Sequence, residues 1–356
     1  MTPARRQRHA ADATSRERAL RLLQSHGWNA TSFQLLEDDF EYFFDGDDAF
    51  VAYVDTGRAW VGGGSPVAPA QRLTAVAAAF AEAARAAGRR ASFFGADERF
   101  LAASGWSSLR VGSQPTWTPA SWTDVLIAAP SLRAQLRRAR AKGVTVSRLP
   151  PPALREGLPL RAAVDALATE WLRRHGLAPM GFLVGVQFYA FGDERLYFVA
   201  RCGERVVGFL AGVPVYARGG WLFEDLLRAD AAPNGTSELL IDAAMRDAAA
   251  AGAAFVTLGM APLAGAVARP LRLARRLSRP LYDFTGVRDF KAKLRPDSWE
   301  ALYVAVPAAA SRWRALLDGL RAFARGGFVR FGLRTARHRT RRRAVKNARR
   351  SATRRA

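Results

Sequence analysis

The stretch of sequence that decides the fold runs from Trp221 to Leu263 and reads WLFEDLLRADAAPNGTSELLIDAAMRDAAAAGAAFVTLGMAPL. Its hydrophobic pattern predicts a strand, a polar turn, a helix and a second strand. The turn is Pro233-Asn234-Gly235, and Gly252 ends the helix. The apolar segment from Ala254 to Leu258 then predicts the second strand. This order of elements is typical of a sheet with helices packed on it.

The first of these strands carries charges that are unusual in an apolar segment. Glu224 and Asp225 follow Trp221-Leu222-Phe223, and Arg228 lies three residues after Asp225. Burying such a charge without a partner is costly. Asp225 and Arg228 therefore either form a structural ion pair or line a polar cleft at the strand end, where α/β sheets bind ligands. Alternation along a strand would point Glu224 away from Asp225, which counts against a role for Glu224.

Length and composition limit the class of protein. A chain of 356 residues is long enough for two domains, and 49% hydrophobic residues suffice for a buried core. The single cysteine, Cys202, excludes an internal disulfide and suits a reducing compartment. Four scattered histidines make a His/Cys metal site improbable, so we expect no metal.

The sequence shows neither the pattern of a signal peptide nor that of a transmembrane helix. The first 23 residues are charged throughout and do not resemble a signal peptide. No stretch reaches the roughly 18 uninterrupted apolar residues of a transmembrane helix. We therefore expect a cytoplasmic protein that does not span a membrane.

The net charge of +23 is concentrated at the C-terminal end, where residues 311–356 contain 16 Lys and Arg and one acidic residue. Such an excess favours polyanionic partners, either nucleic acid or anionic lipid. Apolar residues with helical spacing lie in this segment at Trp313, Leu316, Leu317, Leu320 and Phe323. They predict a basic amphipathic helix that docks on the body or lies on an anionic membrane. Beyond Arg334 the composition predicts disorder in the free chain.

Two further basic segments could contact phosphate. Residues 131–146 predict a helix followed by a strand, and residues 264–280 predict a basic loop that could act as a lid or bind an anion. The candidates for tRNA or phosphate contact in them are Arg133, Arg137, Arg138, Lys142, Arg272 and Arg276.

The pattern divides the chain into four parts. Residues 1–30 are a basic leader with one short helix from Ser15 to His26. Residues 31–125 form a first compact unit, which begins with short strands predicted at Phe33–Leu36 and Phe40–Phe44. Residues 126–307 form a second unit, and residues 308–356 hold the basic helix and tail.

The order of these features resembles the C-terminal synthase domain of the lysylphosphatidylglycerol synthases, also called the phosphatidylglycerol lysyltransferase or multiple peptide resistance factor family. The resemblance covers about residues 35–306, without the transmembrane flippase part of that family. The matching segments are SLRAQLRRARAKGVTV (131–146), APMGFLVG (178–185), GERVVGFLAGVPV (203–215), the stretch from Glu224 to Leu263, and DFKAKLRPDSWEALYVAV (289–306).

The resemblance implies an α/β (α+β) fold made of tandem GCN5-like acetyltransferase (GNAT) folds, with mixed central sheets flanked by helices. It implies that the second fold moves an aminoacyl group from aminoacyl-tRNA to a phosphatidylglycerol hydroxyl, with no cofactor beyond that donor substrate. The family's Asp-x-x-Arg pair falls on Asp225 and Arg228. Its Phe-Lys-x-Lys-Phe motif falls on 290–294, with Leu294 replacing the last aromatic residue. The first-domain Gly-Asp-Pro turn appears as Gly64-Ser65-Pro66, which leaves only scaffolding as an expected role for that domain.

These correspondences give each candidate residue an expected role. We expect Asp225 to pair with the cationic α-amine of the donor, and Arg228 to orient Asp225 or bind phosphate. Lys291 and Lys293 are expected to meet the lipid phosphate or the tRNA end. The remaining candidates are Asn234 and Met260 for substrate binding and Glu224 as a third catalytic residue.

The expected partners are aminoacyl-tRNA and anionic phospholipid, reached at the inner face of the cell membrane. Two alternatives stay open. One is an N-acyltransferase that uses acyl-CoA, although the segment Arg205–Leu210 matches the pyrophosphate loop of such enzymes poorly. The other is a non-catalytic RNA- or membrane-binding protein built on a decayed transferase fold.

Overall fold

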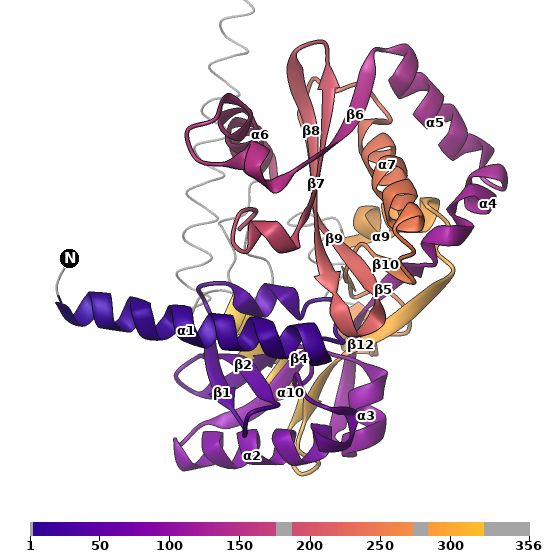
Figure 1. Cartoon of the computed structure of the whole chain (residues 1–356). Helices are drawn as coiled ribbons and strands as arrows, with labels where there is room; N and C mark the ends of the chain where they lie inside the picture. The colour runs from indigo at the N-terminus through magenta and orange to yellow at the C-terminus, as the bar shows by residue number, and fades with distance from the viewer. Residues whose placement is uncertain (1–2, 176–186, 273–283, 324–356) are drawn as a thin grey trace, which may run out of the picture.

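The computed structural model describes residues 3–175, 187–272 and 284–323, and within them the chain forms one mixed sheet covered by helices (Figure 1). Its strands are β1 (Glu41–Phe44), β2 (Phe50–Asp55), β3 (Ala59–Gly63), β4 (Arg90–Ala96), β5 (Ser107–Trp117), β6 (Val144–Leu149), β7 (Leu196–Cys202), β8 (Arg205–Val215), β9 (Gly220–Arg228), β10 (Phe255–Thr257), β11 (Ala261–Pro262) and β12 (Ser298–Val306). Their order is β1-β2-β3-β4-β12-β5-β10-β9-β8-β7-β6, and β11 pairs with β5.

The sheet runs without a break through both predicted units. β12 comes from the end of the second unit, yet it lies between β4 and β5 of the first. β5 in turn pairs antiparallel with β10, which belongs to the second unit. The two halves share hydrogen-bonded strands where they meet, so the sheet itself marks no boundary between them. The division at residue 125 stays a prediction.

Helices cover both faces of the first half of the sheet. α2 (Leu73–Ala86) and α3 (Glu98–Ser104) pack on one face, around Phe80, Phe93 and Phe100. α1 (Pro3–His26), the 3-10 helix η1 (Phe33–Leu36) and α10 (Arg312–Phe323) contribute to the cluster on the other face. The strand predicted at 33–36 is therefore wrong, since Phe33, Leu35 and Leu36 are all buried and a helical turn can point all three inward. The helix predicted from Ser15 begins earlier, at Pro3.

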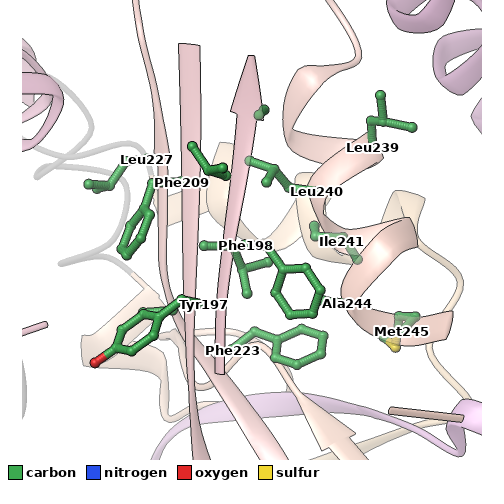
Figure 2. Close-up of a cluster of buried hydrophobic side chains, with 14 of the residues drawn as sticks. Tyr197, Phe198, Phe209, Phe223, Leu227, Leu239, Leu240, Ile241, Ala244 and Met245 are labelled. Atoms are coloured by element: carbon green, nitrogen blue, oxygen red, sulfur yellow. The ribbon is translucent and has the colours of Figure 1, made fainter. Parts of the chain in front are cut away.

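The second half is organised around α7 (Thr236–Ala250), whose apolar side packs on β7, β8 and β9 (Figure 2). In Figure 2, Phe198 and Phe223 point toward α7, whereas Tyr197, Phe209 and Leu227 point to the opposite face. α6 (Pro159–His175) packs on that opposite face of the sheet, against β8 and β9. The predicted strand, turn, helix and strand of residues 221–258 are all present.

The remaining helices are α4 (Trp122–Ile127), α5 (Pro130–Ala141), which packs on α7, and α9 (Phe284–Lys293). No helix among the described residues is long and apolar enough to cross a bilayer. The matching segment 178–185, residues 273–280 of the predicted basic loop and the tail beyond 323 lie outside the described residues.

Candidate functional site

The candidate site is built on an irregularity in β9. Ala211 of β8 is paired with Asp225, but the next residue, Gly212, is paired with Phe223. Glu224 is therefore the extra residue of a β-bulge, and has no partner opposite it on β8. A bulge bends the strand and interrupts the alternation of side chains, and it is found next to active sites.

The bulge decides which face each charged side chain occupies. Phe223 points toward α7, and Leu227, four residues later, points away from it (Figure 2). Residues four apart in a regular strand share a face, so the side chains change phase at the bulge. Glu224 and Asp225 consequently both lie on the face away from α7. The sequence-based argument that they point in opposite directions is wrong.

Arg228 lies on the other face of the sheet. Its partner on β8 is Gly208, where an added side chain would meet Leu240 and Thr236 of α7. Cross-strand partners share a face, so Arg228 is directed to the side of α7. Among the described residues the structure contains no ion pair between Asp225 and Arg228. Direct orientation of Asp225 by Arg228 is thus excluded in this structure, and contact with phosphate stays a prediction.

The partner of the acidic pair is Arg195, at the start of β7. Its guanidinium forms an ion pair with Glu224, and its Nε donates to the carbonyl of Ala190 at 2.8 Å. The side chains of Arg195 and Glu224 are only 2% and 6% exposed. Gln34 of η1 donates to the second oxygen of Glu224 at 3.2 Å. Glu224 is therefore held rigidly by two donors from different parts of the chain.

Glu37, immediately after η1, adds a third carboxylate from the first half of the chain. It is 4% exposed, and its Oε2 has no hydrogen-bond partner within the described part of the chain. Burial, followed by the negative charge of Glu224, raises the pKa of Glu37 to about 8. An unpartnered buried carboxylate oxygen is unusual, and the raised pKa of Glu37 accounts for it, since the neutral protonated form is cheaper to bury.

The pKa of Asp225 is shifted in the same direction as that of Glu37. Burial and the adjacent Glu224 raise the pKa of Asp225 well above its ordinary value, while Arg195 opposes the shift and Glu37 adds to it. Three carboxyl groups, Glu37, Glu224 and Asp225, thus share one guanidinium, that of Arg195. This cluster, the acidic cluster below, is deficient in positive charge when its acids are ionised.

The pairing between β9 and β10 ends beside the acidic cluster. The two strands are paired only between Gly220–Leu222 and Phe255–Thr257, so the edge of β9 from Phe223 onward is not bonded to β10. The segment that follows β10 is tied down by Lys291 of α9. Its ammonium donates to the carbonyls of Leu258, Gly259 and Met260 at 2.8, 2.8 and 3.0 Å. Lys291 therefore anchors the segment that follows β10 from within the protein.

The two predicted lysines are both engaged inside the protein. Burial lowers the pKa of Lys291 to about 7, while its three carbonyl partners favour the charged form. Lys293 forms an ion pair of 2.7 Å with Glu238, in the first turn of α7. Contact of either lysine with lipid or tRNA stays a prediction, and it would require these bonds to be exchanged. Met260 is half-buried beside Gly112, and Asn234 is exposed in the turn before α7.

The predicted phosphate-binding arginines are spread over the surface. Arg133 donates to the carbonyls of Leu126 and Ile127, which closes the end of α4. The other exposed cations of the set are Arg137 and Arg138 on α5, Lys142 directly after it, and Arg272. Arg276 lies outside the described residues.

A cavity of about 420 Å³ lies away from the acidic cluster, at the start of β9 and β10. Trp28, Phe255 and Glu300 line it. Arg218 in this cavity pairs with Glu300 at 2.6 Å and stacks on Phe255, with its guanidinium 3.5 Å from the ring centre. The polar side chains that line the cavity thus largely form their ion pairs and hydrogen bonds with one another.

The family of the chain follows from its sequence as a whole. The family described as "Phosphatidylglycerol lysyltransferase, C-terminal" matches residues 20–306. The chain belongs to this family. No curated protein matches the chain.

Solved structures show the same fold. The C-terminal domain (DUF2156) assigned to a lysylphosphatidylglycerol synthetase of Agrobacterium fabrum superposes with a TM-score of 0.75 at 23% identity, covering 89% of this chain and 99% of that one. L-PGS from Bacillus licheniformis gives 0.73 at 23% identity, covering 86% and 96%. FemX gives 0.53 at 10% identity, covering 82% and 95%.

Membership confirms the expected fold, a GNAT-like mixed sheet flanked by helices, and makes the chain a member of a transferase family. Glu37 and Arg195 of the acidic cluster, and Gln34, which donates to Glu224, were not among the sequence-based candidates. Their distance from Glu224 along the chain hides them, because 190 residues separate Gln34 from it. The acidic run Glu37-Asp38-Asp39 directly after an apolar turn was the one available signal.

Proposed function

We propose that the chain moves a lysine-like aminoacyl group from aminoacyl-tRNA to the hydroxyl of a phosphatidylglycerol-type lipid. The observation that carries the proposal is the acidic cluster, in which three buried or half-buried carboxyl groups share the guanidinium of Arg195. An aminoacyl ester brings at least one ammonium group. A carboxylate removed from water is costly unless a cation pairs with it, so the ammonium group of the donor would stabilise the ionised carboxylates of the cluster.

Each member of the cluster then has a role. Asp225, which has no ion pair among the described residues, contacts the α-ammonium of the donor. Glu224 is fixed by Arg195 and Gln34, and it supplies negative charge without moving. Glu37 adds a carboxylate for a second positive charge, which a lysine-like side chain would bring. In this proposal the first half of the chain completes the site rather than only supporting it.

The transfer reaction needs little from the protein beyond the correct positioning of the donor ester and the lipid hydroxyl. The ester carbonyl of the donor is already activated, so the lipid hydroxyl oxygen forms the new ester bond and the ribose oxygen of the tRNA leaves with the proton. The acceptor is a membrane lipid, and we therefore place the protein at the inner face of the membrane, in peripheral contact with it. The basic surface of α5 and the cations of residues 311–356 suit both the tRNA and the anionic lipid.

A donor comparison tests the proposal. Purified protein is incubated with vesicles that contain both phosphatidylglycerol and the amino lipid phosphatidylethanolamine, and with either labelled lysyl-tRNA or labelled acetyl-CoA, and the two lipid products are separated. We expect label in the phosphatidylglycerol product, from lysyl-tRNA only. Label transferred from acetyl-CoA would favour the N-acyltransferase instead, and no transfer from any aminoacyl-tRNA or acyl-CoA would favour a binding protein without activity.

A further inference from the structure

α10 packs on the sheet through its small residues. Ala315, Gly319 and Ala322 are buried on it, and a side chain at Gly319 would come within 2.6 Å of the ring of Phe94. Phe323, at the end of the helix, meets the same ring edge-on, with 4.9 Å between ring centres. The helix backbone therefore lies close to β3, β4 and β12, and the docked face is the small-residue face.

An ion pair fixes the rotation of α10 about its axis. Asp318 is 1% exposed, and Arg90 of β4 donates to its carboxylate through Nε and Nη2 at 2.8 to 3.0 Å. Arg321 donates to the same carboxylate at 3.0 Å. A buried carboxylate that lost these donors would be strongly destabilised, so the helix cannot turn to bury its other side.

The face turned outward carries the large apolar residues. Trp313, Leu317 and Leu320 are 43%, 47% and 42% exposed. Spacings of four and three residues place them in one stripe along the helix. Soluble proteins normally bury such a stripe, and here the small residues take the core positions instead.

Positive charge borders this stripe. Arg312 and Arg314 are exposed at its first turn, and the one acidic residue of the helix, Asp318, is on the docked side. The sequence that follows, residues 324–356, has 13 Lys and Arg and no acidic residue. An apolar stripe edged by cations complements the surface of an anionic bilayer, where acyl chains lie beneath phosphate groups.

We propose that α10 is the membrane-binding surface of the protein. Trp313, Leu317 and Leu320 enter the boundary between headgroups and acyl chains, and the arginines contact lipid phosphates. This inference stands on the geometry of α10 and does not require the proposed transfer reaction.

Vesicle flotation with the full-length protein tests it. The probe is a vesicle of phosphatidylcholine with phosphatidylglycerol, compared with pure phosphatidylcholine. We expect wild type to float with the anionic vesicles, and the double substitution Leu317→Glu and Leu320→Glu to weaken binding by about tenfold or more. Because both leucines are exposed, the melting temperature should change little. Leu172→Glu, at a leucine 39% exposed on α6, is the matched control and should bind as wild type does.

Three results would overturn the inference. Wild type could fail to float with anionic vesicles, or the double variant could float as well as wild type, which would assign binding to the charged C-terminal sequence alone. The third is a dimer of the wild type that the double substitution dissociates while flotation is unchanged. That result, read by sedimentation velocity, would make the stripe a contact between two copies.

Discussion

Glu224 and Asp225 are adjacent in the chain and nevertheless present their carboxyl groups on the same face of the sheet. The β-bulge at Glu224 produces this arrangement, because it places one extra residue on β9 opposite β8. The consequence is electrostatic: the two acids lie in one cluster with Glu37, where Arg195 is the guanidinium that the described residues supply. Because the pKa values of Glu37 and Asp225 are both raised, these two carboxyl groups favour the protonated form in the free chain, and a cationic ligand would favour their ionised form.

Asp225→Asn should abolish transfer without harming the fold. The amide keeps the shape of the side chain but cannot neutralise an ammonium group, so we expect the transfer rate from lysyl-tRNA to fall by about 100-fold or more. The melting temperature should stay the same or rise, since burial already disfavours the charged carboxylate.

Asp124→Asn is the matched control for this substitution, at an exposed aspartate in the first turn of α4. It should transfer at the wild-type rate. An Asp225→Asn protein that is folded and fully active would remove Asp225 from the site.

Arg195→Met should be the most destabilising single change at the cluster. It leaves the carboxylate of Glu224 buried with only Gln34 as a donor, and removing one partner of a buried ion pair costs about 3–5 kcal/mol. Adding Glu224→Gln should recover part of this loss, because the uncompensated charge disappears. Urea unfolding of the two single variants and the double variant measures the coupling. Additive losses would show that the two side chains do not interact.

Much of the fold could be predicted because it follows from local patterns. The strand, turn, helix and second strand of residues 221–258 are set by apolar periodicity, Pro233-Asn234-Gly235 and Gly252, and each is present in the structure. The segment Phe33–Leu36 was misassigned because four consecutive residues are too few to distinguish a strand from a 3-10 turn. Burial against distant parts of the chain selects the 3-10 turn, and a short window of sequence does not contain this information.

The site was predictable only in part. Charges inside an apolar strand pointed to Glu224 and Asp225, but nothing in their sequence indicates a bulge, so their shared face could not be foreseen. Arg228 was paired with Asp225 by proximity along the chain, whereas the sheet puts it on the side of α7. Arg195 and Glu37 reach the cluster through strand order, which periodicity alone does not determine.

Glu37→Gln should change how stability depends on pH. The pKa of Glu37 is raised to about 8 in the folded chain from an ordinary value of 4.5. The folded state thus holds a proton that the unfolded state releases, and this group's stabilising contribution is complete below about pH 4.5 and is lost as the pH rises to about 8. The loss amounts to a few kcal/mol, at about 1.4 kcal/mol per pKa unit.

The comparison is the free energy of unfolding from pH 5 to pH 8.5 for wild type and Glu37→Gln. Wild type should lose more stability than the variant over this interval. Parallel curves for the two proteins would mean that Glu37 titrates normally.

Lys291→Met should destabilise the segment after β10. The substitution removes the donor to three carbonyls, and each buried acceptor left without a partner costs about 1–3 kcal/mol unless water enters. We expect a loss of several kcal/mol in unfolding free energy and faster hydrogen exchange around Gly259. Lys293→Met removes an ion pair with a buried carboxylate and should cost less than Lys291→Met, because the first turn of α7 still favours the charge of Glu238. Equal losses for the two variants would contradict the anchoring role of Lys291.

The most direct test of the central claim is the binding of a donor analogue to the acidic cluster. Lysine amide carries the α-ammonium of an aminoacyl ester, and Nα-acetyl-lysine amide lacks it, so calorimetric titration of both compounds isolates that charge. We predict that wild type binds lysine amide about tenfold or more tightly than the acetylated compound, and that Asp225→Asn removes the difference. Equal affinity of wild type for the two amides, or a preference that survives in Asp225→Asn, would contradict the account.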